Sequence, residues 1–317
     1  MNFQLRHNLL ITIFIIVIIA VMWLLMKGLS YSFDQLSTPE LGKSSQEQAQ
    51  AKKTAYIEKI DNFALQEFNA LQNLSHFVEA DNYYNFKDEP ALLVNPKVTT
   101  YNENGELNYV LTSKRAHYLD TGEVSFKGEV DISSSNGMRH KMNTEELLVD
   151  TNTENLLSRK KVTYLGEDAK ILSQGMNMQA KTDKMQLTGE TVIYQDGGQK
   201  MLTKDLHVDQ SNQKKHYYSK NKTTYLSAEN KIYAQGLDMQ DATTKLLGKV
   251  SLLQNSGSNI QTKNITIDQT DGAEVYQTNE GIHYRSTVAD IRAKGMHYDA
   301  AQQKIKFTGD VVGQYDQ

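Results

Sequence analysis

The side chains that could perform chemistry are acids and histidines that recur one at a time along the chain. Five aspartates fall where turns are expected to begin: Asp120, Asp150, Asp209, Asp268 and Asp299. Aspartate favours turns because its carboxylate hydrogen-bonds to the nearby backbone. His117, His207 and His297 occupy the middle of expected strands, one per repeat, so a shared metal site is not expected. These residues predict turns and strands rather than a catalytic or metal centre.

Composition excludes further classes of chemistry. The 317 residues contain no cysteine, which rules out disulfides, thiolate metal ligands and thiol catalysis. No glycine-rich phosphate loop and no Gly-x-Ser-x-Gly motif is present. The net charge of −4, without a block of Lys or Arg, argues against a nucleic-acid partner. We therefore expect no enzymatic activity and no cofactor.

The N-terminal region carries a long apolar run. Leu9 to Met26 contains no charge, and its length of roughly 27 Å as a helix matches the hydrocarbon thickness of a bilayer. Residues 22–27 lack the small-residue cleavage site of a secretory signal, although a cleaved signal peptide remains the alternative. The charge bias predicts a transmembrane helix over 9–26, with residues 1–8 in the cytoplasm and 27–44 as a linker.

A second helix is expected after this linker. Ser45 and Gln48 have the spacing of a capping box. Apolar residues then recur at intervals of three or four: Ile57, Ile60, Ala64, Phe68, Leu71, Leu74 and Val78. This period predicts an amphipathic helix over 45–81, followed by a linker over 82–95.

From residue 96 onward the sequence indicates strands. All three prolines, Pro39, Pro90 and Pro96, precede the last 221 residues, and proline interrupts strand pairing because it lacks an N–H group. Seven short strands share one apolar anchor position, with spacings of 31, 29, 30, 31, 28 and 31 residues: Tyr118, Val149, Met178, Val208, Met239, Ile267 and Tyr298. The regularity predicts a repeat architecture of about seven 30-residue units over 96–317.

Within these units apolar and polar residues alternate, which is typical of strands with one buried face. Gly128, Gly189, Gly248 and Gly309 are 61, 59 and 61 residues apart, so alternate units match best. We expect each unit to place one strand in each of two facing sheets, which gives a stack roughly 35–40 Å long with open edges at both ends. The predicted fold is mainly β, an elongated, twisted β-jellyroll.

The inward positions predict an apolar trough that could hold lipid. Methionine is frequent there, and its flexible side chain adapts to variable apolar ligands, although filling of a sandwich core is the commoner role of such a face. The expected lipid-groove residues are Tyr109, Leu111, Phe126, Val130, Leu147, Val149, Met176, Met178, Met185, Leu187, Leu206, Val208, Leu237, Met239, Leu246, Val250, Ile265, Ile267, Met296, Tyr298, Ile305, Phe307 and Val311.

Both ends of this region resemble the LptC family of lipopolysaccharide export proteins. The resemblance rests on Tyr101-Asn102-x-x-Gly105-x-Leu107-x-Tyr109-x-Leu111 with His117-Tyr118, and on Gly295-Met296-x-Tyr298 through Val311-Val312-Gly313-Gln314-Tyr315. The internal repeats resemble the OstA-like fold of the soluble bridge protein LptA. The helix at 45–81 has no counterpart in this resemblance, and the usual family member is shorter by two or three repeats.

The resemblance implies an inner-membrane protein with its C-terminal domain in the periplasm. It would accept lipopolysaccharide from a permease pair with its ATPase and pass it to an LptA-like bridge or an outer-membrane translocon. The implied partner-interface residues are Val98, Thr100 and Gly105 at the N-terminal edge, and Gly295, Val312 and Tyr315 near the exit.

Two other functions remain open from the sequence. A membrane-tethered structural or adhesive β-solenoid would have the same repeats with a completely filled core. A repeat-fold enzyme acting on envelope polysaccharide would need paired carboxylates in a polar cleft, whereas the acids here stand at turns.

Overall fold

The computed structural model describes residues 56–315, except 70, 102–103, 120, 135–140, 151–152, 154, 167–168, 180–181, 183, 210–214 and 271. This part of the chain is built from antiparallel strands and contains no α-helix. Among these residues no helix has the length and apolar character needed to cross a bilayer. The transmembrane helix expected over 9–26 and its flanking segments 1–8 and 27–44 lie outside the described residues.

The described strands are β1 (Tyr56–Phe68), β2 (Leu74–Phe86), β3 (Ala91–Val94), β4 (Lys97–Tyr101), β5 (Leu107–Thr112), β6 (Arg115–Tyr118), β7 (Glu123–Ser134), β8 (Lys141–Asp150), β9 (Asn155–Ser158), β10 (Val162–Leu165), β11 (Ala169–Ser173), β12 (Gly175–Gln179), β13 (Lys184–Gln195), β14 (Lys200–Asp209), β15 (His216–Ser219), β16 (Thr223–Leu226), β17 (Asn230–Ala234), β18 (Gly236–Gln240), β19 (Thr243–Gln254), β20 (Asn259–Asp268), β21 (Val275–Thr278), β22 (Ile282–Arg285), β23 (Ala289–Ala293), β24 (Gly295–Asp299), β25 (Lys304–Thr308) and β26 (Val312–Tyr315).

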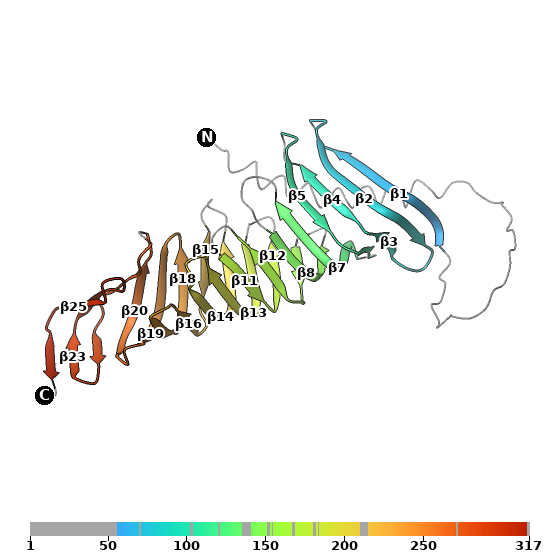
Figure 1. The fold of residues 1–317 in the computed structure, drawn as a ribbon. Helices are drawn as coiled ribbons and strands as arrows, with labels where there is room; N and C mark the ends of the chain where they lie inside the picture. Colours follow the sequence, from blue (N-terminus) through green and yellow to red (C-terminus); the bar gives the residue numbers. More distant parts are fainter. Residues whose placement is uncertain are drawn as a thin grey trace, which may run out of the picture.

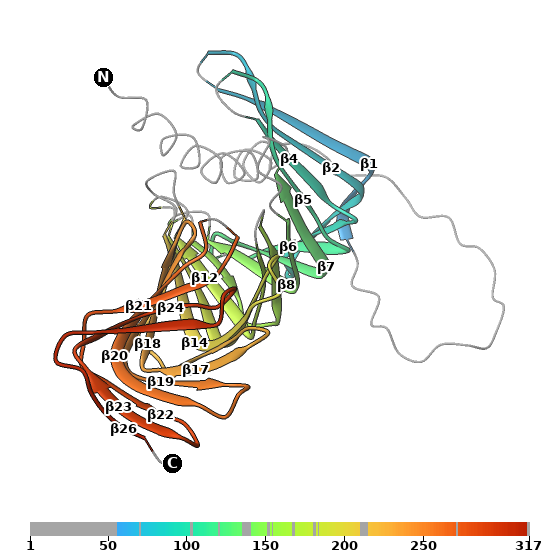
Figure 2. The ribbon, with the colours of Figure 1, turned by 60° about the vertical axis from the view of Figure 1, so that its left-hand side comes forward.

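These strands form one continuous sheet that folds lengthwise into a jellyroll with two facing sheets (Figure 1). Long strands such as β7, β8, β13 and β14 run through both sheets and join them along one side. The first sheet is completed by β3, β6, β9, β12, β15, β18, β21, β24 and β25, and the second by β4, β5, β10, β11, β16, β17, β22, β23 and β26. The stack twists from β1 at one end to β26 at the other, as expected for strands of L-residues (Figures 1 and 2). The predicted fold class, an elongated and twisted β-jellyroll, is confirmed for this part of the chain.

Each long strand bends where its pairing register slips. The slip falls between Leu187 and Glu190 in β13, around Gly189, whose φ is 75°. Glycine adopts this left-handed conformation without a Cβ penalty. The Gly189 N–H donates to Asp205 Oδ1 of β14 at 2.8 Å. A local bulge therefore turns the strand from the first sheet into the second.

The apolar core lies between the two sheets. All seven anchor residues of the sequence repeat face inward, and a single cluster of buried side chains extends from Val78 in β2 to Tyr298 in β24. Each 30-residue unit contributes two strands to each sheet, because the chain passes from one sheet to the other twice per unit. The expected length of 35–40 Å, based on one strand per unit, was therefore wrong by about a factor of two.

The amphipathic helix predicted over 45–81 was wrong for the described residues 56–81. These residues form β1 and most of β2, an antiparallel hairpin whose register runs from Tyr56↔Phe86 to Phe68↔Leu74. The helical spacing was misleading because Ile57 and Phe68 are exposed, whereas the inward residues alternate with period two. Strands also occupy most of the linker expected over 82–95, since β2 continues to Phe86 and β3 covers 91–94. The described jellyroll begins at residue 56.

Candidate functional site

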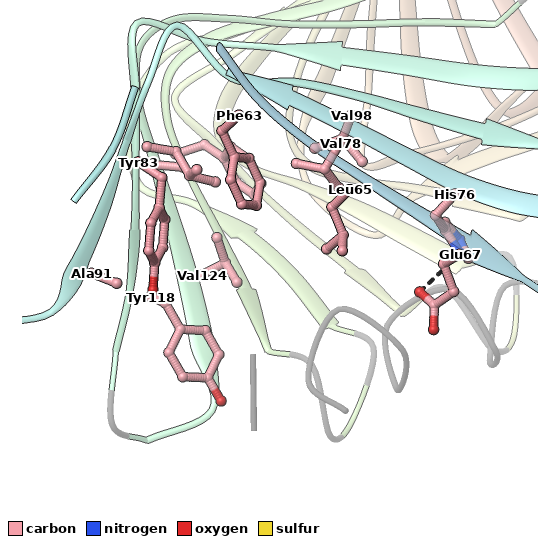
Figure 3. Close-up of a pocket in the computed structure, with 13 residues that line it drawn as sticks. Phe63, Leu65, Glu67, His76, Val78, Tyr83, Ala91, Val98, Tyr118 and Val124 are labelled. Carbon is pink, nitrogen blue, oxygen red and sulfur yellow. Dashed lines mark ion pairs between the residues drawn. The ribbon is translucent and has the colours of Figure 1, made fainter. Parts of the chain in front are cut away.

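A cavity lies between the two sheets at the β1 end of the stack. Its internal volume is about 50 Å³, and the whole depression amounts to about 700 Å³ when the space open to solvent is included. Four strands beyond the first hairpin, β3, β4, β6 and β7, contribute to it, and most of its wall is apolar. The lining residues are Phe63, Leu65, Glu67, His76, Val78, Tyr83, Ala91, Leu93, Val98, Ala116, Tyr118, Val124 and Phe126 (Figure 3).

The β1–β2 hairpin supplies one wall of this cavity through strand alternation. Phe63, Leu65 and Glu67 project from the same face of β1 because successive side chains of a strand point to opposite faces. Leu65 pairs with Val78 across the hairpin, and Glu67 pairs with His76. The hairpin therefore gives the cavity an apolar wall that ends in a polar pair.

That pair stands at one end of the cavity, with Tyr83 and Tyr118 at the other (Figure 3). His76 Nδ1 lies 3.7 Å from Glu67 Oε2 and 3.0 Å from Ser75 Oγ. Burial raises the pKa of the Glu67 carboxyl to about 7 and lowers the pKa of His76 to about 3. In this apolar setting the neutral forms are favoured, so we treat the contact as a neutral polar pair rather than a permanent ion pair.

Beyond the cavity the interior is filled by side chains. Leu147, Leu187, Leu206, Leu246 and Ile267 are completely buried. They come from successive long strands, so they follow the axis of the stack. The structure therefore combines an open apolar chamber at one end with a closed apolar core along most of its length.

The expected groove residues fall almost entirely on this inner surface. Eighteen of the 23 are buried in the single core cluster, and Met178, Ile305 and Phe307 are partly buried against it. Phe126 alone among them lines the cavity. The eighteen are Leu111, Phe126, Val130, Leu147, Val149, Met176, Met185, Leu187, Leu206, Val208, Leu237, Met239, Leu246, Val250, Ile265, Ile267, Met296 and Tyr298.

Two expected groove residues lie elsewhere. Tyr109 is 40% exposed, in the part of β5 next to the β4–β5 turn. Val311 is 51% exposed, in the break between β25 and β26. Period-two alternation assigns a face but not a position along the strand, and both residues lie where the strands leave the core.

The expected N-terminal edge residues are not at an edge. β4 pairs with β2 on one side and β5 on the other, and both Val98 and Thr100 are buried. Gly105 lies in the β4–β5 turn, where its φ of 79° requires a left-handed conformation. The first strand of the described stack is β1, which pairs with β2 alone within that part of the chain.

At the other end the expected interface residues divide into two groups. Gly295 is buried in β24, where a Cβ would come within 2.7 Å of Thr308 Oγ1, so this glycine allows close strand packing. Val312 and Tyr315 are 70% and 67% exposed on β26. Among the described strands β25 pairs only with β24, and β26 only with β23. Both therefore leave a free edge that could accept another strand.

The cavity wall formed by the hairpin was missed from the sequence. Phe63 and Leu65 are two residues apart, and so are Val78 and Ala80, with Glu79 between the latter two. A spacing of two residues predicts strands, but the same segment also has apolar residues three or four apart, which predict a helix. The inward-facing series of each strand also includes one polar residue, Glu67 in β1 and His76 in β2, so the alternation was hard to recognise.

The arrangement agrees with the comparison to known protein families. Residues 14–196 match the family model described as "Lipopolysaccharide-assembly, LptC-related", which covers more than half of the chain. No curated protein matches the chain. The matched segment includes the hairpin, the cavity and the strands up to β13.

Proposed function

Because the chain belongs to the LptC-related family of lipopolysaccharide-assembly proteins, we propose that it is a membrane-anchored periplasmic carrier of lipopolysaccharide. Family membership supports a role in lipopolysaccharide transport, and the family is a transport component rather than an enzyme family. The proposed mechanism is that acyl chains enter between the two sheets at the β1 end and move along the apolar interior.

The observation that carries this proposal is the chamber at the β1 end. Its wall is apolar over most of its extent, and Val78, Val98, Ala116, Val124 and Phe126 belong both to this wall and to the continuous core. Acyl chains gain free energy when they leave water for such a surface, by about 0.8 kcal/mol per CH₂ group. An entering chain would therefore meet apolar contacts that continue into the next layers.

The ends of the stack support a direction of transfer. We propose that residues 9–26 anchor the chain in the inner membrane, which places the β1 end nearest the bilayer. The free edge of β1 would receive the permease pair of the export machine, and the free edges of β25 and β26 would receive an LptA-like bridge protein or the outer-membrane translocon. Strand addition at an open edge provides main-chain hydrogen bonds for both contacts.

Photocrosslinking in cells tests the carrier function. A photoreactive residue at Leu65 or Phe126 would face the chamber, whereas one at Lys127 faces outward from the same strand as Phe126. We expect lipopolysaccharide adducts from the two inward positions, at least about tenfold above the Lys127 control. Equal labelling from Phe126 and Lys127 would contradict transport through the interior.

A second candidate is a membrane-tethered structural or adhesive β-solenoid. The completely buried side chains from β8 to β20 favour it, because they leave the middle of the stack filled. On this hypothesis acyl chains would never enter beyond the chamber. Crosslinks to lipopolysaccharide from Met178 and Met239 would exclude it, whereas their absence in an actively exporting cell would support it.

A further inference from the structure

A buried polar cluster interrupts the apolar interior in the C-terminal half of the stack. It gathers side chains from both sheets at the side away from the bends, where the strand turns form two facing lips. All but one of its members lie beyond residue 196, where the family match ends. They are Gln195, Gln199, Tyr225, Ser227, Asn230, Gln269, Glu274 and Tyr276.

Glu274 is the centre of this cluster. It lies just before β21 in the first sheet, and its carboxylate accepts a hydrogen bond from Tyr276 Oη of β21. From the second sheet, Tyr225 Oη donates to Glu274 Oε1 at 2.7 Å and Gln199 Nε2 donates to the same oxygen at 2.9 Å. Hydrogen bonds to a carboxylate are stronger than those between neutral groups.

Further hydrogen bonds cross between the sheets around this centre. Asn230 Nδ2 of β17 donates to Tyr276 Oη at 3.2 Å, and Ser227 Oγ lies 3.4 Å from the same oxygen. Gln269 Nε2, which follows β20, donates to Tyr225 Oη at 3.3 Å. The partners are 44 to 49 residues apart in sequence, so these contacts join the two lips directly.

The phenols occupy space that an acyl chain would need. Tyr225 and Tyr276 are completely buried, and Tyr276 stacks on Tyr298 with ring centroids 5.4 Å apart. Burial is the largest cause that raises the pKa of both phenols above the ordinary value, so both keep the proton that they donate. The two rings therefore close the interior while their hydroxyl groups hold the lips together.

Some buried polar atoms in and beside the cluster have no hydrogen-bond partner among the described residues. Asn230 Oδ1 and Gln195 Oε1 are buried without a hydrogen-bond partner in the described structure, and so is Thr244 Oγ1 nearby in β19. A buried unsatisfied polar atom costs free energy that water or a ligand would recover on opening. An apolar core would close the same space without this cost, so the residues favour a contact that opens rather than a permanent seal.

We propose that the cluster around Glu274 is a latch that closes the C-terminal half of the trough and opens when acyl chains pass. This inference rests on the proposed carrier function for its purpose, although the latch itself can be tested without lipid. In the closed state the lips of β16–β17 and β20–β21 are joined. In the open state Tyr225 and Tyr276 move apart and the interior becomes continuous with the chamber at the β1 end.

Spin labels on the two sheets test the latch in the full-length chain. The chain has no cysteine, so Lys231→Cys in β17 and Gln277→Cys in β21 introduce two exposed labelling sites on opposite sheets. We expect Glu274→Ala and Tyr276→Phe each to lengthen and broaden the distance distribution. The matched control is Glu229→Ala, an exposed acid in the β16–β17 turn, which should leave the distribution unchanged.

Hydrogen exchange gives a second, independent measurement. Amide exchange in β16, β17 and β21 should rise about tenfold in Tyr276→Phe, because a hydrogen bond to a charged group contributes to local closure. Protection in β7 and β8, far along the stack, should not change and verifies that the variant is folded. Unchanged distances and unchanged exchange in both variants would overturn the latch.

Lipid labelling separates the two proposals. In the latch variants a photoreactive residue at Met239 should crosslink to added lipopolysaccharide several times more than in the parent chain. If the lips open in the absence of lipid but no crosslink forms from Met239 or Phe126, the latch stands and the carrier function fails. If Phe126 crosslinks but the lips never open, the carrier function stands and the latch fails.

Discussion

Replacing Glu67 by glutamine should protect the β1–β2 hairpin against opening, and the effect should grow with pH. In the folded hairpin burial raises the pKa of Glu67 to about 7, from an ordinary value of 4.5. The stability that comes from burying the neutral carboxyl is fully present below pH 4.5 and is lost as the pH rises through 7. Glutamine stays neutral throughout, so the two chains should diverge across this window.

The magnitude follows from the two pKa values. The difference between 4.5 and about 7 corresponds to at most about 3.5 kcal/mol, at roughly 1.4 kcal/mol for each pH unit. Solvent reaches the carboxyl through the open chamber, and its side chain is 15% exposed, so we expect about 1–2 kcal/mol after screening. That range corresponds to a factor of about 5–30 in the opening equilibrium.

Amide hydrogen exchange across β1, followed between pH 5 and pH 8, measures this factor. The ratio of exchange rates in the parent and in Glu67→Gln at the same pH cancels most of the intrinsic pH dependence. The ratio also cancels the contribution of His76 to the pH dependence of opening, which is present in both chains. The lowered pKa of His76 makes that contribution opposite in sign to that of Glu67. Glu79→Gln is the matched control, because Glu79 lies on β2 with an exposed carboxylate paired to Lys97 at 3.1 Å. A rate ratio that stays constant with pH would refute the reasoning about Glu67.

Two further predictions concern the C-terminal end. Gly295→Ala should lower the free energy of unfolding by about 1–3 kcal/mol, because the new Cβ would lie 2.7 Å from Thr308 Oγ1 and 2.9 Å from the Thr278 carbonyl oxygen. Gly281→Ala is the control, because no atom lies within 4 Å of its Cβ position. Equal losses of stability for the two variants in urea unfolding would contradict the packing argument. Val312→Lys should leave the free energy of unfolding within about 0.5 kcal/mol of the parent chain, because Val312 is 70% exposed. It should weaken the docking of an LptA-like bridge protein that we propose at β26. Crosslinking yields that match those of a Tyr233→Lys control would argue against β26 as the docking edge.

The inner surface of the jellyroll could be predicted because a strand repeats its environment every two residues. The anchors from Val149 to Tyr298 each face the core, and Gly189 and Gly248 mark the bends. These features depend only on local pattern, so a single sequence contains them. The two exposed exceptions, Tyr109 and Val311, depend on where each strand leaves the core, which the pattern does not encode.

The cavity and the latch required the three-dimensional arrangement. Glu67 and His76 belong to a hairpin whose edge strand exposes Ile57 and Phe68, so its apolar residues gave a helical rather than an alternating pattern. The latch brings Gln199 and Glu274 together across 75 residues. Nothing in the local sequence of either residue indicates the other, because the contact depends on how two turns on opposite sheets face each other.

The bends recur at equivalent points, Gly189 in β13 and Gly248 in β19, with one long hairpin and one set of short strands between them. Removing or duplicating the segment from Gly189 to Gly248 would join two equivalent bend positions. The strands at both ends of the stack would stay unchanged. Each such module adds four strands to each sheet, about 19 Å of reach at the usual strand spacing. The length of the stack can thereby change in whole modules, while the free strand edges at β1 and at β25 and β26 stay the same.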